Sequence, residues 1–298
     1  MRFPPPLDRG ARVALVAPAG PLRDARELEI ARAQAESLGW EPVIGEHALA
    51  RTGYLAGYDA ERARDFNNAL RDERIDGIWC LRGGYGTMRL LEVVDFDAIR
   101  RHPKTLIGYS DITALHAAFG RCADVVTYHG PTARSPLSNF SRQSLVHAVT
   151  DRRDSCGVAD AARVLRSGRA EGRLVGGNLA LLAALCGTPY SPDYTGAILV
   201  LEDIGEATYR IDRMLRQLHL CGALSRLAGI AFGQFTGRED DDEGVPALDD
   251  LFRDVADAAG VPSITGIPLG HIDDQWTIPL GATALLDADA RTITVVSA

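Results

Sequence analysis

The strongest constraint on the fold is an alternation of short apolar runs with amphipathic segments through the first 120 residues. The apolar runs, which predict buried strands, lie at 12–20, 41–45, 77–81 and 105–109. Segments with helical periodicity lie between them, at 24–40 and 59–76, and a further helix begins near 112. Alternation at this spacing predicts βαβ units and a parallel sheet with helices on both faces. Ligand chemistry in such sheets gathers at the carboxyl ends of the strands.

The pattern weakens between about 134 and 172, where the chain becomes polar and rich in Ser and Arg. We therefore predict an N-terminal α/β domain of the flavodoxin or Rossmann type over 1–150, an interdomain crossover over 151–170 and a mixed α/β domain over 171–298. The elements expected in the second domain are a loop and helix at 176–190, strands at 197–203 and 227–237, helices at 209–222 and 247–260, and a closing hairpin at 283–298.

Composition narrows the function classes. The formal net charge of −8 disfavours non-specific binding to nucleic acid. No stretch approaches the roughly 18 consecutive apolar residues of a membrane span, and three prolines near the start interrupt any signal-peptide core, so we expect a cytoplasmic protein. The five cysteines are scattered without a CxxC pair, which indicates neither a zinc site nor a disulfide framework, and we expect most of them in the core. The acidic run 239–243 lacks EF-hand spacing and is predicted to be a solvated loop.

Ser110 lies where a predicted strand meets a predicted helix, in the stretch "TLIGYSDITALHAAFG". A serine at such a turn can be a nucleophile whose oxyanion is bound partly by the next N–H. The generic signal G-x-S-x-G lacks its second glycine here. A serine also caps helices well, so this stretch alone leaves both interpretations open.

A glycine loop follows the predicted strand at 77–81, in "LRGGYGTMRLL". Gly83, Gly84 and Gly86 would let a backbone approach a ligand and direct free N–H groups at it. The Walker and G-x-G-x-x-G patterns are absent. The loop could supply the second oxyanion donor, bind an anion, or be a tight turn.

A serine nucleophile needs a histidine base and a group that orients it. Of seven histidines, His129 and His271 are flanked by Gly and Pro in expected loop ends, and His271 is the stronger candidate. For the orienting acid, Glu202 and Asp203 follow a buried strand, and Glu206 is the runner-up. Carboxylates at such a position can instead cap the next element or pair with an arginine.

The motifs "RGGYG", "IGYSDITALH", "HGP", "GGNL", "LEDIGE", "YRIDRML" and "PLGH", in that order, resemble the LD-carboxypeptidase family. These S66 serine peptidases also include the microcin C self-immunity peptidases. The resemblance covers nearly the whole chain and implies a Ser-Glu-His triad, with the serine in the first domain and the other two residues in the second. It implies Ser110 as nucleophile, Glu202 as orienting acid and His271 as base, with oxyanion donors at the amides of Asp111 and Gly84.

The resemblance further implies a cytoplasmic homodimer that removes the terminal D-Ala from murein tetrapeptides during cell-wall recycling, without a metal or cofactor. Arg82, next to Gly83 in the glycine loop, is a candidate clamp for the substrate carboxylate, or it pairs with a nearby acid. A rival within the family is a microcin C-like immunity peptidase that cuts an aminoacyl-nucleotide conjugate. Rivals outside this activity are a phosphate-binding protein that uses "RGGYG", and a catalytically idle binding module.

Overall fold

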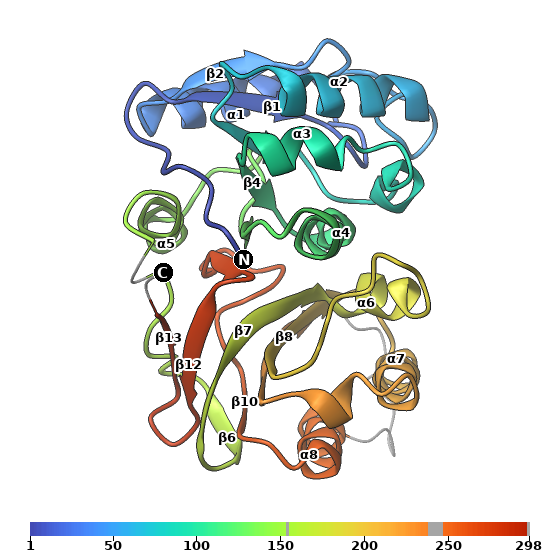
Figure 1. Ribbon diagram of the computed structural model, residues 1–298, viewed down its shortest axis with the longest axis vertical. Helices are drawn as coiled ribbons and strands as arrows, with labels where there is room; N and C mark the ends of the chain where they lie inside the picture. The colour runs from blue at the N-terminus through green and yellow to red at the C-terminus, as the bar shows by residue number, and fades with distance from the viewer. Residues whose placement is uncertain (153–154, 238–246, 297–298) are drawn as a thin grey trace.

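The computed structural model describes residues 1–152, 155–237 and 247–296. These residues form two sheets, each flanked by helices, which are stacked along the long axis of the molecule (Figure 1). The acidic run predicted as a solvated loop lies outside the described residues. Among the helices that the structure describes, none combines the length and the apolar composition that crossing a bilayer requires.

The first sheet has the strand order β11-β5-β4-β3-β1-β2 in the described chain. Strands β1 to β5, which come first along the chain, are mutually parallel, as predicted from the alternation. They follow the flavodoxin order 2-1-3-4-5. Their bounds are β1 Arg12–Val16, β2 Glu41–Ile44, β3 Gly77–Cys80, β4 Thr105–Gly108 and β5 Thr127–His129. In this order the crevice at the topological switch point lies between the carboxyl ends of β1 and β3.

Helices cover both faces of the first sheet. Helix α1 (Ala25–Ser37) begins at Asp24, whose side chain accepts from two N–H groups of the first turn, and it buries Leu28, Ala31 and Ala35. It shares a core with α5 (Asn139–Val149). The core on the opposite face contains side chains of α2 (Asp59–Arg71), α3 (Phe96–Arg101) and α4 (Thr113–Ala123).

The second sheet is mixed, as expected, with the described strands in the order β13-β12-β7-β8-β9-β10-β6. Strands β7 to β10 are parallel, and β6, β12 and β13 pair antiparallel. The bounds are β6 Arg163–Arg166, β7 Arg169–Asn178, β8 Ala197–Ile204, β9 Gly229–Thr236, β10 Ser263–Thr265, β12 Thr283–Asp287 and β13 Thr292–Val295. The last two form the predicted hairpin.

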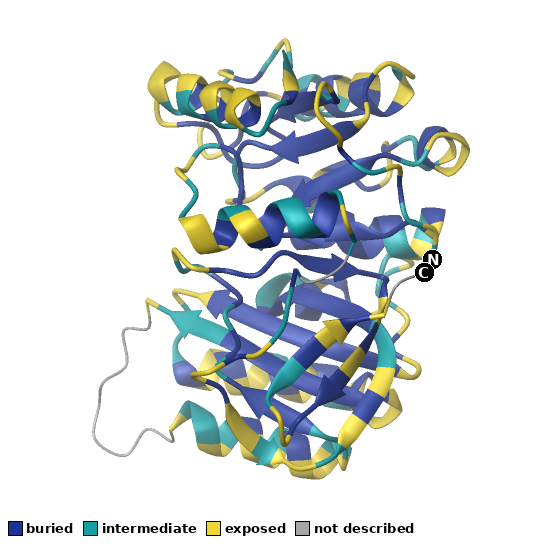
Figure 2. Ribbon diagram, turned by 90° about the vertical axis from the view of Figure 1, so that its left-hand side faces the viewer, coloured by how far each residue is buried: buried dark blue, intermediate teal, exposed yellow. Residues whose placement is uncertain are grey.

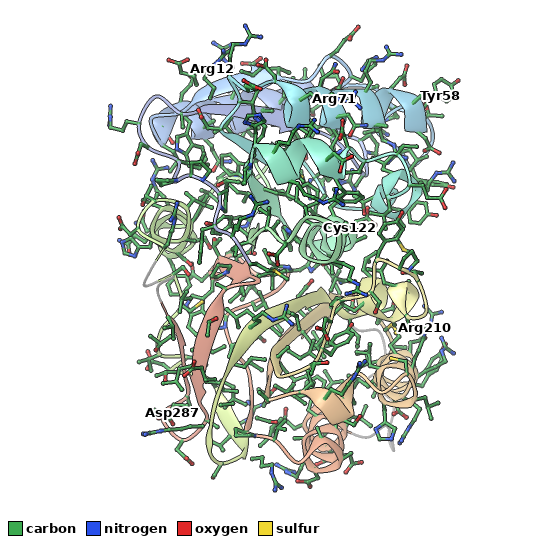
Figure 3. The ribbon with its side chains drawn as sticks, viewed as in Figure 1. Arg12, Tyr58, Arg71, Cys122, Arg210 and Asp287 are labelled. Atoms are coloured by element: carbon green, nitrogen blue, oxygen red, sulfur yellow. The ribbon has the colours of Figure 1, made fainter. Side chains whose placement is uncertain are left out.

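One face of the second sheet packs on α6 (Leu179–Leu185), α7 (Thr208–Leu220) and α8 (Leu248–Ala259). Side chains of its other face belong to the same apolar core as α1 and the first sheet. Figure 3 shows Arg210 of α7 and Asp287 of the terminal hairpin on opposite sides of this domain, with Cys122 at the level where the two sheets meet. The strands of both sheets are largely buried, whereas the outward faces of the helices are exposed (Figure 2).

The chain departs from the predicted organisation in several places. Strand β7 begins within the predicted crossover and continues into the segment 176–190, whose start is predicted as a loop, and the sequence predicts neither α5 nor β10. Strand β11 (Ile278–Leu280), from the predicted second domain, pairs antiparallel with β5 and completes the first sheet. Its three residues are too few to show a period in the sequence. Strand β6 lies within the predicted crossover 151–170 and pairs with β10. It is an edge strand with mostly exposed residues, so it lacks the apolar alternation that would reveal it.

Ile278 is wholly buried where β11 closes the first sheet. We predict that Ile278→Ala lowers the free energy of unfolding by about 3 kcal/mol, because it removes buried apolar surface and leaves a cavity. Ile44→Ala is the matched control, since that side chain is 39% exposed, and it should cost less than about 1 kcal/mol. Urea unfolding followed by tryptophan fluorescence measures both. Equal losses in the two variants would contradict a structural role for β11.

Candidate active site

Ser110 lies on a sharp turn between β4 and α4. Its φ of +64° is in the left-handed region, which serine rarely adopts. A short 3-10 turn, Ser110–Ile112, follows and leads into α4. Tyr109 and Ile112 occupy the N-cap positions of these two elements, and neither makes a side-chain cap hydrogen bond. The helix-cap interpretation of Ser110 is therefore wrong, and Ser110 lies instead on a strained strand-to-helix turn, which we call the elbow.

The glycine loop lies directly against this turn. A Cβ built on Gly83 would come within 2.8 Å of the Ser110 Cβ and 3.1 Å of its Oγ, so only glycine fits there. The carbonyl of Gly83 accepts a hydrogen bond from the Gly20 N–H at 3.0 Å, which joins the loops after β1 and β3 at the switch point. Because this peptide is trans, the N–H of Gly84 points away from Gly20.

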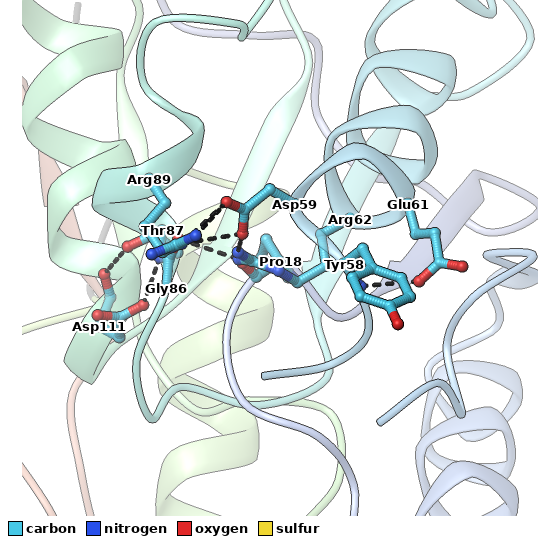
Figure 4. Close-up of polar contacts among 9 residues, drawn as sticks. All are labelled: Pro18, Tyr58, Asp59, Glu61, Arg62, Gly86, Thr87, Arg89 and Asp111. Carbon is cyan, nitrogen blue, oxygen red and sulfur yellow. Dashed lines mark hydrogen bonds and ion pairs between the residues drawn. The ribbon is translucent and has the colours of Figure 1, made fainter. Parts of the chain in front are cut away.

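A network of polar contacts joins Asp111, the residue after Ser110, to the loop after β3 and to helix α2 (Figure 4). The Asp111 carboxylate accepts from the Thr87 N–H at 2.8 Å, and the Thr87 hydroxyl donates to the Asp111 carbonyl at 2.5 Å. The buried Arg62 guanidinium donates to the carbonyl of Gly86 and pairs with Asp59. Sequence reasoning missed Asp59, Arg62 and Thr87, because charged helix residues and a threonine before a helix are usually solvated or capping groups.

Glu202 and His271 are joined in the second domain. The His271 Nδ1 lies 2.8 Å from a Glu202 carboxylate oxygen, and the Glu202 side chain is wholly buried. A carboxylate only accepts, so the tautomer of the neutral imidazole that fits this contact has its proton on Nδ1 and a lone pair on Nε2. This is the tautomer that a general base requires.

The loop that carries His271 is held by α5. The Ser141 hydroxyl donates to the Asp273 carbonyl at 2.7 Å and accepts from the Gln275 N–H at 2.9 Å. One turn further along α5, the Ser144 hydroxyl accepts from the Thr277 N–H at 2.7 Å. Sequence reasoning missed both serines, since their stretch showed only the Ser-rich polarity of a linker.

The neighbouring acids have other roles. The Asp203 carboxylate accepts from the Asn178 side-chain amide and from the N–H groups of Ala180 and Ile204, at 2.8 to 2.9 Å. Burial raises the pKa of Asp203 to about 6, although these hydrogen bonds oppose the shift. Glu206 lies 3.6 Å from Arg210 in an ion pair. Of the three candidate acids, only Glu202 contacts a histidine among the described residues.

The carboxyl ends of β4 and β7 meet between the two sheets. The Asn178 N–H donates to the hydroxyl of Thr113 at 3.0 Å, and Thr113 lies three residues after Ser110. In the β7–β8 register Asn178 is the partner of Glu202. The rings of Tyr109 and His271 lie 4.8 Å apart, so the residue before Ser110 contacts the candidate base. The two halves of the predicted triad therefore face the same interdomain region.

A cavity of about 200 Å³ opens beside this region. Its lining comes from the ring of Tyr109, the loop after β5, helix α5 and the His271 loop, and includes Thr132, Leu137, Ser141, His271 and Asp273.

His129 does not lie in a loop end as predicted. It belongs to β5 and is wholly buried, and burial lowers its pKa well below the usual range. His116, predicted to be structural, is also buried and bonds to the Gly108 carbonyl at 2.8 Å. Neither ring is placed to act as an exposed base.

Arg82 is partly buried beside the switch point. Its guanidinium donates to the Pro21 carbonyl. Burial lowers the pKa of Arg82, and the nearby charge of Arg134 adds to this shift. Arg134 itself pairs with Glu27 at 3.0 Å. This corner of the site is therefore positively charged.

Within the described part of the chain, one group of side chains could act as metal ligands: Glu46, His47 and Asp65. The Asp65 carboxylate accepts from the His47 backbone N–H at 2.7 Å and contacts its Nδ1 at 2.8 Å. These contacts account for the cluster as an ion pair at the end of β2.

The strain at Ser110 makes a testable prediction. Ser110→Gly should be more stable than Ser110→Ala by roughly 1 kcal/mol, because glycine adopts a φ of +64° without the Cβ penalty. Ser225 is the matched control, because it is exposed and its φ is not positive. At that position Ser225→Ala should be more stable than Ser225→Gly. Thermal denaturation of the four variants measures both differences. The same order at both positions would contradict strain at Ser110.

Comparison with known proteins extends these observations. Models of the LD-carboxypeptidase N-terminal and C-terminal domains match residues 13–130 and 171–286. The chain is 37% identical to the murein tetrapeptide carboxypeptidase of Pseudomonas aeruginosa, over 95% of each protein.

Two solved structures have the same fold. A muramoyltetrapeptide carboxypeptidase from Oxalobacter formigenes is 31% identical and superposes with a TM-score of 0.86, over 96% of this chain and 98% of that one. The microcin C7 self-immunity protein, in complex with aspartyl sulfamoyl adenosine, has a TM-score of 0.91 at 23% identity, over 100% of this chain and 99% of that one. Both domain models and the extent of identity lead to one conclusion: the chain belongs to the LD-carboxypeptidase family and is a carboxypeptidase.

Proposed function

We propose that Ser110, His271 and Glu202 form a catalytic triad that removes the terminal D-Ala from murein tetrapeptides. The observation that carries the proposal is the 2.8 Å contact between His271 Nδ1 and the buried Glu202 carboxylate. Tyr109, the residue before the strained Ser110, contacts the ring of the same histidine. The names of the Pseudomonas and Oxalobacter relatives supply the substrate class.

In this mechanism, Nε2 of His271 takes the proton from Ser110 as Oγ attacks the scissile carbonyl. Glu202 holds the imidazole in the required tautomer and stabilises the imidazolium that forms. The imidazolium then protonates the departing amino group of D-Ala. Water, activated by the same histidine, hydrolyses the acyl-enzyme and restores Ser110.

The N–H groups of Asp111 and Gly84 bind the oxyanion. Asp111 follows the nucleophile, and its carboxylate is held by Thr87, so the backbone at this position is fixed. The Gly83 carbonyl is occupied by Gly20, which leaves the Gly84 N–H directed away from that contact. Each donor contributes about 3 kcal/mol to transition-state stabilisation.

An exopeptidase must also bind the free carboxylate of its substrate. We assign this role to Arg82, whose guanidinium retains donors beyond the one used by Pro21 and lies next to Gly83 at the elbow. Burial and the neighbouring Arg134 make this corner favourable for an anion. Gly83 is the second residue that we assign to substrate binding, because its missing Cβ lets the backbone of the glycine loop lie directly against Ser110.

A cytoplasmic enzyme of this kind would process peptides that return from wall turnover. We place the protein in the cytoplasm on its composition and on the family resemblance, and we propose a homodimer on the resemblance alone. Size-exclusion chromatography with light scattering determines the oligomeric state.

The first experiment measures D-Ala release from purified murein tetrapeptide at neutral pH. We predict that the wild type releases one D-Ala per peptide and that Ser110→Ala lowers kcat by at least about 10³-fold, because the variant lacks the hydroxyl that the mechanism uses for the attack. Ser225→Ala, on an exposed 3-10 turn, is the matched control and should keep full activity.

Each other outcome has a definite meaning. Equal release by the wild type and Ser110→Ala would refute the assigned nucleophile. Release by neither protein, with the fold intact, would refute the substrate and favour aminoacyl-nucleotide conjugates, the alternative that the likeness to the microcin C7 self-immunity protein raises.

The carboxylate clamp makes a separate prediction. Arg82→Ala should raise KM for the free-acid tetrapeptide about tenfold or more and leave KM for the C-terminally amidated peptide unchanged, since only the free acid offers a carboxylate. Arg210→Ala on α7 is the control. Equal losses on both peptides would instead indicate that Arg82 acts by holding the loop at Pro21.

A further inference from the structure

Two cysteines that are far apart in the sequence meet in the second domain. The Sγ atoms of Cys186 and Cys221 lie 3.6 Å apart, although the residues are separated by 35 positions. The expectation that most of the five cysteines lie in the core is wrong, because Cys80 alone is buried. Cys186 is only partly buried and Cys221 is exposed. The sequence lacks a signal for the contact, since the residues lie on different helices.

Helices α6 and α7 hold Cys186 and Cys221 close to each other. Cys186 is the C-cap residue of α6, and Cys221 is the C-cap residue of α7. One turn earlier the Gln217 side chain donates to the Ala183 carbonyl at 2.6 Å, which joins the same two helices. A helix end lies outside the regular backbone ladder, so its residues can adjust more easily than interior ones. The sulfurs need to approach by roughly 1.5 Å to reach the disulfide bond length.

We propose that Cys186 and Cys221 are a redox modification site, at which hydrogen peroxide or a related hydroperoxide converts the two thiols to an intramolecular disulfide. The proposal rests on their contact and on the accessibility of Cys221, and it is independent of the proposed peptidase function. No residue of the proposed triad takes part in the step.

The chemistry proceeds in two balanced steps. The Cys221 thiolate attacks one peroxide oxygen, the O–O bond breaks, and the released hydroxide takes a proton to give water and a sulfenic acid. The Cys186 sulfur then attacks the Cys221 sulfur, the S–O bond breaks, and the hydroxide leaves as water with the Cys186 proton. Two sulfurs are oxidised, and the two peroxide oxygens are reduced to two molecules of water.

The two thiols have unequal roles. Cys221 is exposed and meets the oxidant first. Burial raises the pKa of Cys186 to about 12, and the hydrogen bond with Cys221 adds to the shift, so Cys186 remains a thiol until the sulfenic acid forms beside it. It is therefore the resolving residue.

The bond would stabilise the domain rather than switch the enzyme off. It closes a loop that contains all of β8, including Glu202, and ties together the far ends of the helices that follow β7 and β8. About 20 Å of helix α7 separates Cys221 from the start of that helix, so the crosslink leaves the site geometry in place. Its main effect is to restrict the unfolded chain.

The test treats fully reduced full-length protein with hydrogen peroxide. Thiol titration under denaturing conditions should fall from five to three, and peptide mapping should identify the Cys186–Cys221 disulfide. The melting temperature should rise by roughly 5–10 °C and return to its original value after dithiothreitol. D-Ala release should change less than twofold.

Matched variants separate the pair from the other thiols. Cys186→Ser and Cys221→Ser should each abolish the peroxide-induced rise in melting temperature, whereas Cys122→Ser, at a partly buried thiol outside the pair, should retain it. Wild-type protein that keeps five thiols, or that pairs other cysteines, would overturn the proposal, and mapping of the wild type decides this even where a variant fails to fold. A disulfide at this site without a rise in melting temperature would overturn the stabilising role.

Discussion

The candidate site depends on the close contact between the carboxyl ends of the parallel strands β4 and β7, which belong to different sheets. The Asn178 N–H donates to the Thr113 hydroxyl, and this bond crosses from β7 to the start of α4. It requires Gly177, because a Cβ there would lie 2.6 Å from the Thr113 hydroxyl. Parallel sheets gather their loops at one edge, so placing two such edges against each other brings residues of both domains into one region. A separation of a few ångströms at this contact would move His271 away from the turn that carries Ser110.

The strained turn at Ser110 persists because the structure around it leaves no alternative. A left-handed serine costs of order 1–3 kcal/mol. The close approach of Gly83 on one side and the bonds between Asp111 and Thr87 on the other fix the backbone. Arg62 of α2 also restrains the glycine loop, because its guanidinium donates to the Gly86 carbonyl. The elbow therefore belongs to a rigid network that continues through the loop after β3 into α2.

The sequence predicted those features that arise from local patterns. Alternating apolar runs and helical segments predicted the first sheet, and the turn residues around Ser110 and His271 indicated displayed side chains. Features produced by tertiary contact left no such pattern. Strand β11 has three residues, the sulfurs of Cys186 and Cys221 meet across two helices, and Ser141 supports the His271 loop from a stretch that resembled a linker. These contacts exist only after the chain has folded.

The adjacent acids Glu202 and Asp203 show why the local residue pattern left the candidate orienting acid open, so that only the family resemblance pointed to Glu202. Successive residues of a strand point to opposite faces, so one register decides both roles. Asp203 points toward the start of α6 and binds its free N–H groups together with Asn178. Glu202 points toward His271. The β8–β9 register shifts between Leu201 and Asp203, and the Gln234 N–H there bonds the Leu269 carbonyl of the histidine loop. Irregularities of this kind change the direction of side chains beside functional sites. Here the histidine loop lies beside Glu202, whereas the Asp203 carboxylate is already bound by Asn178.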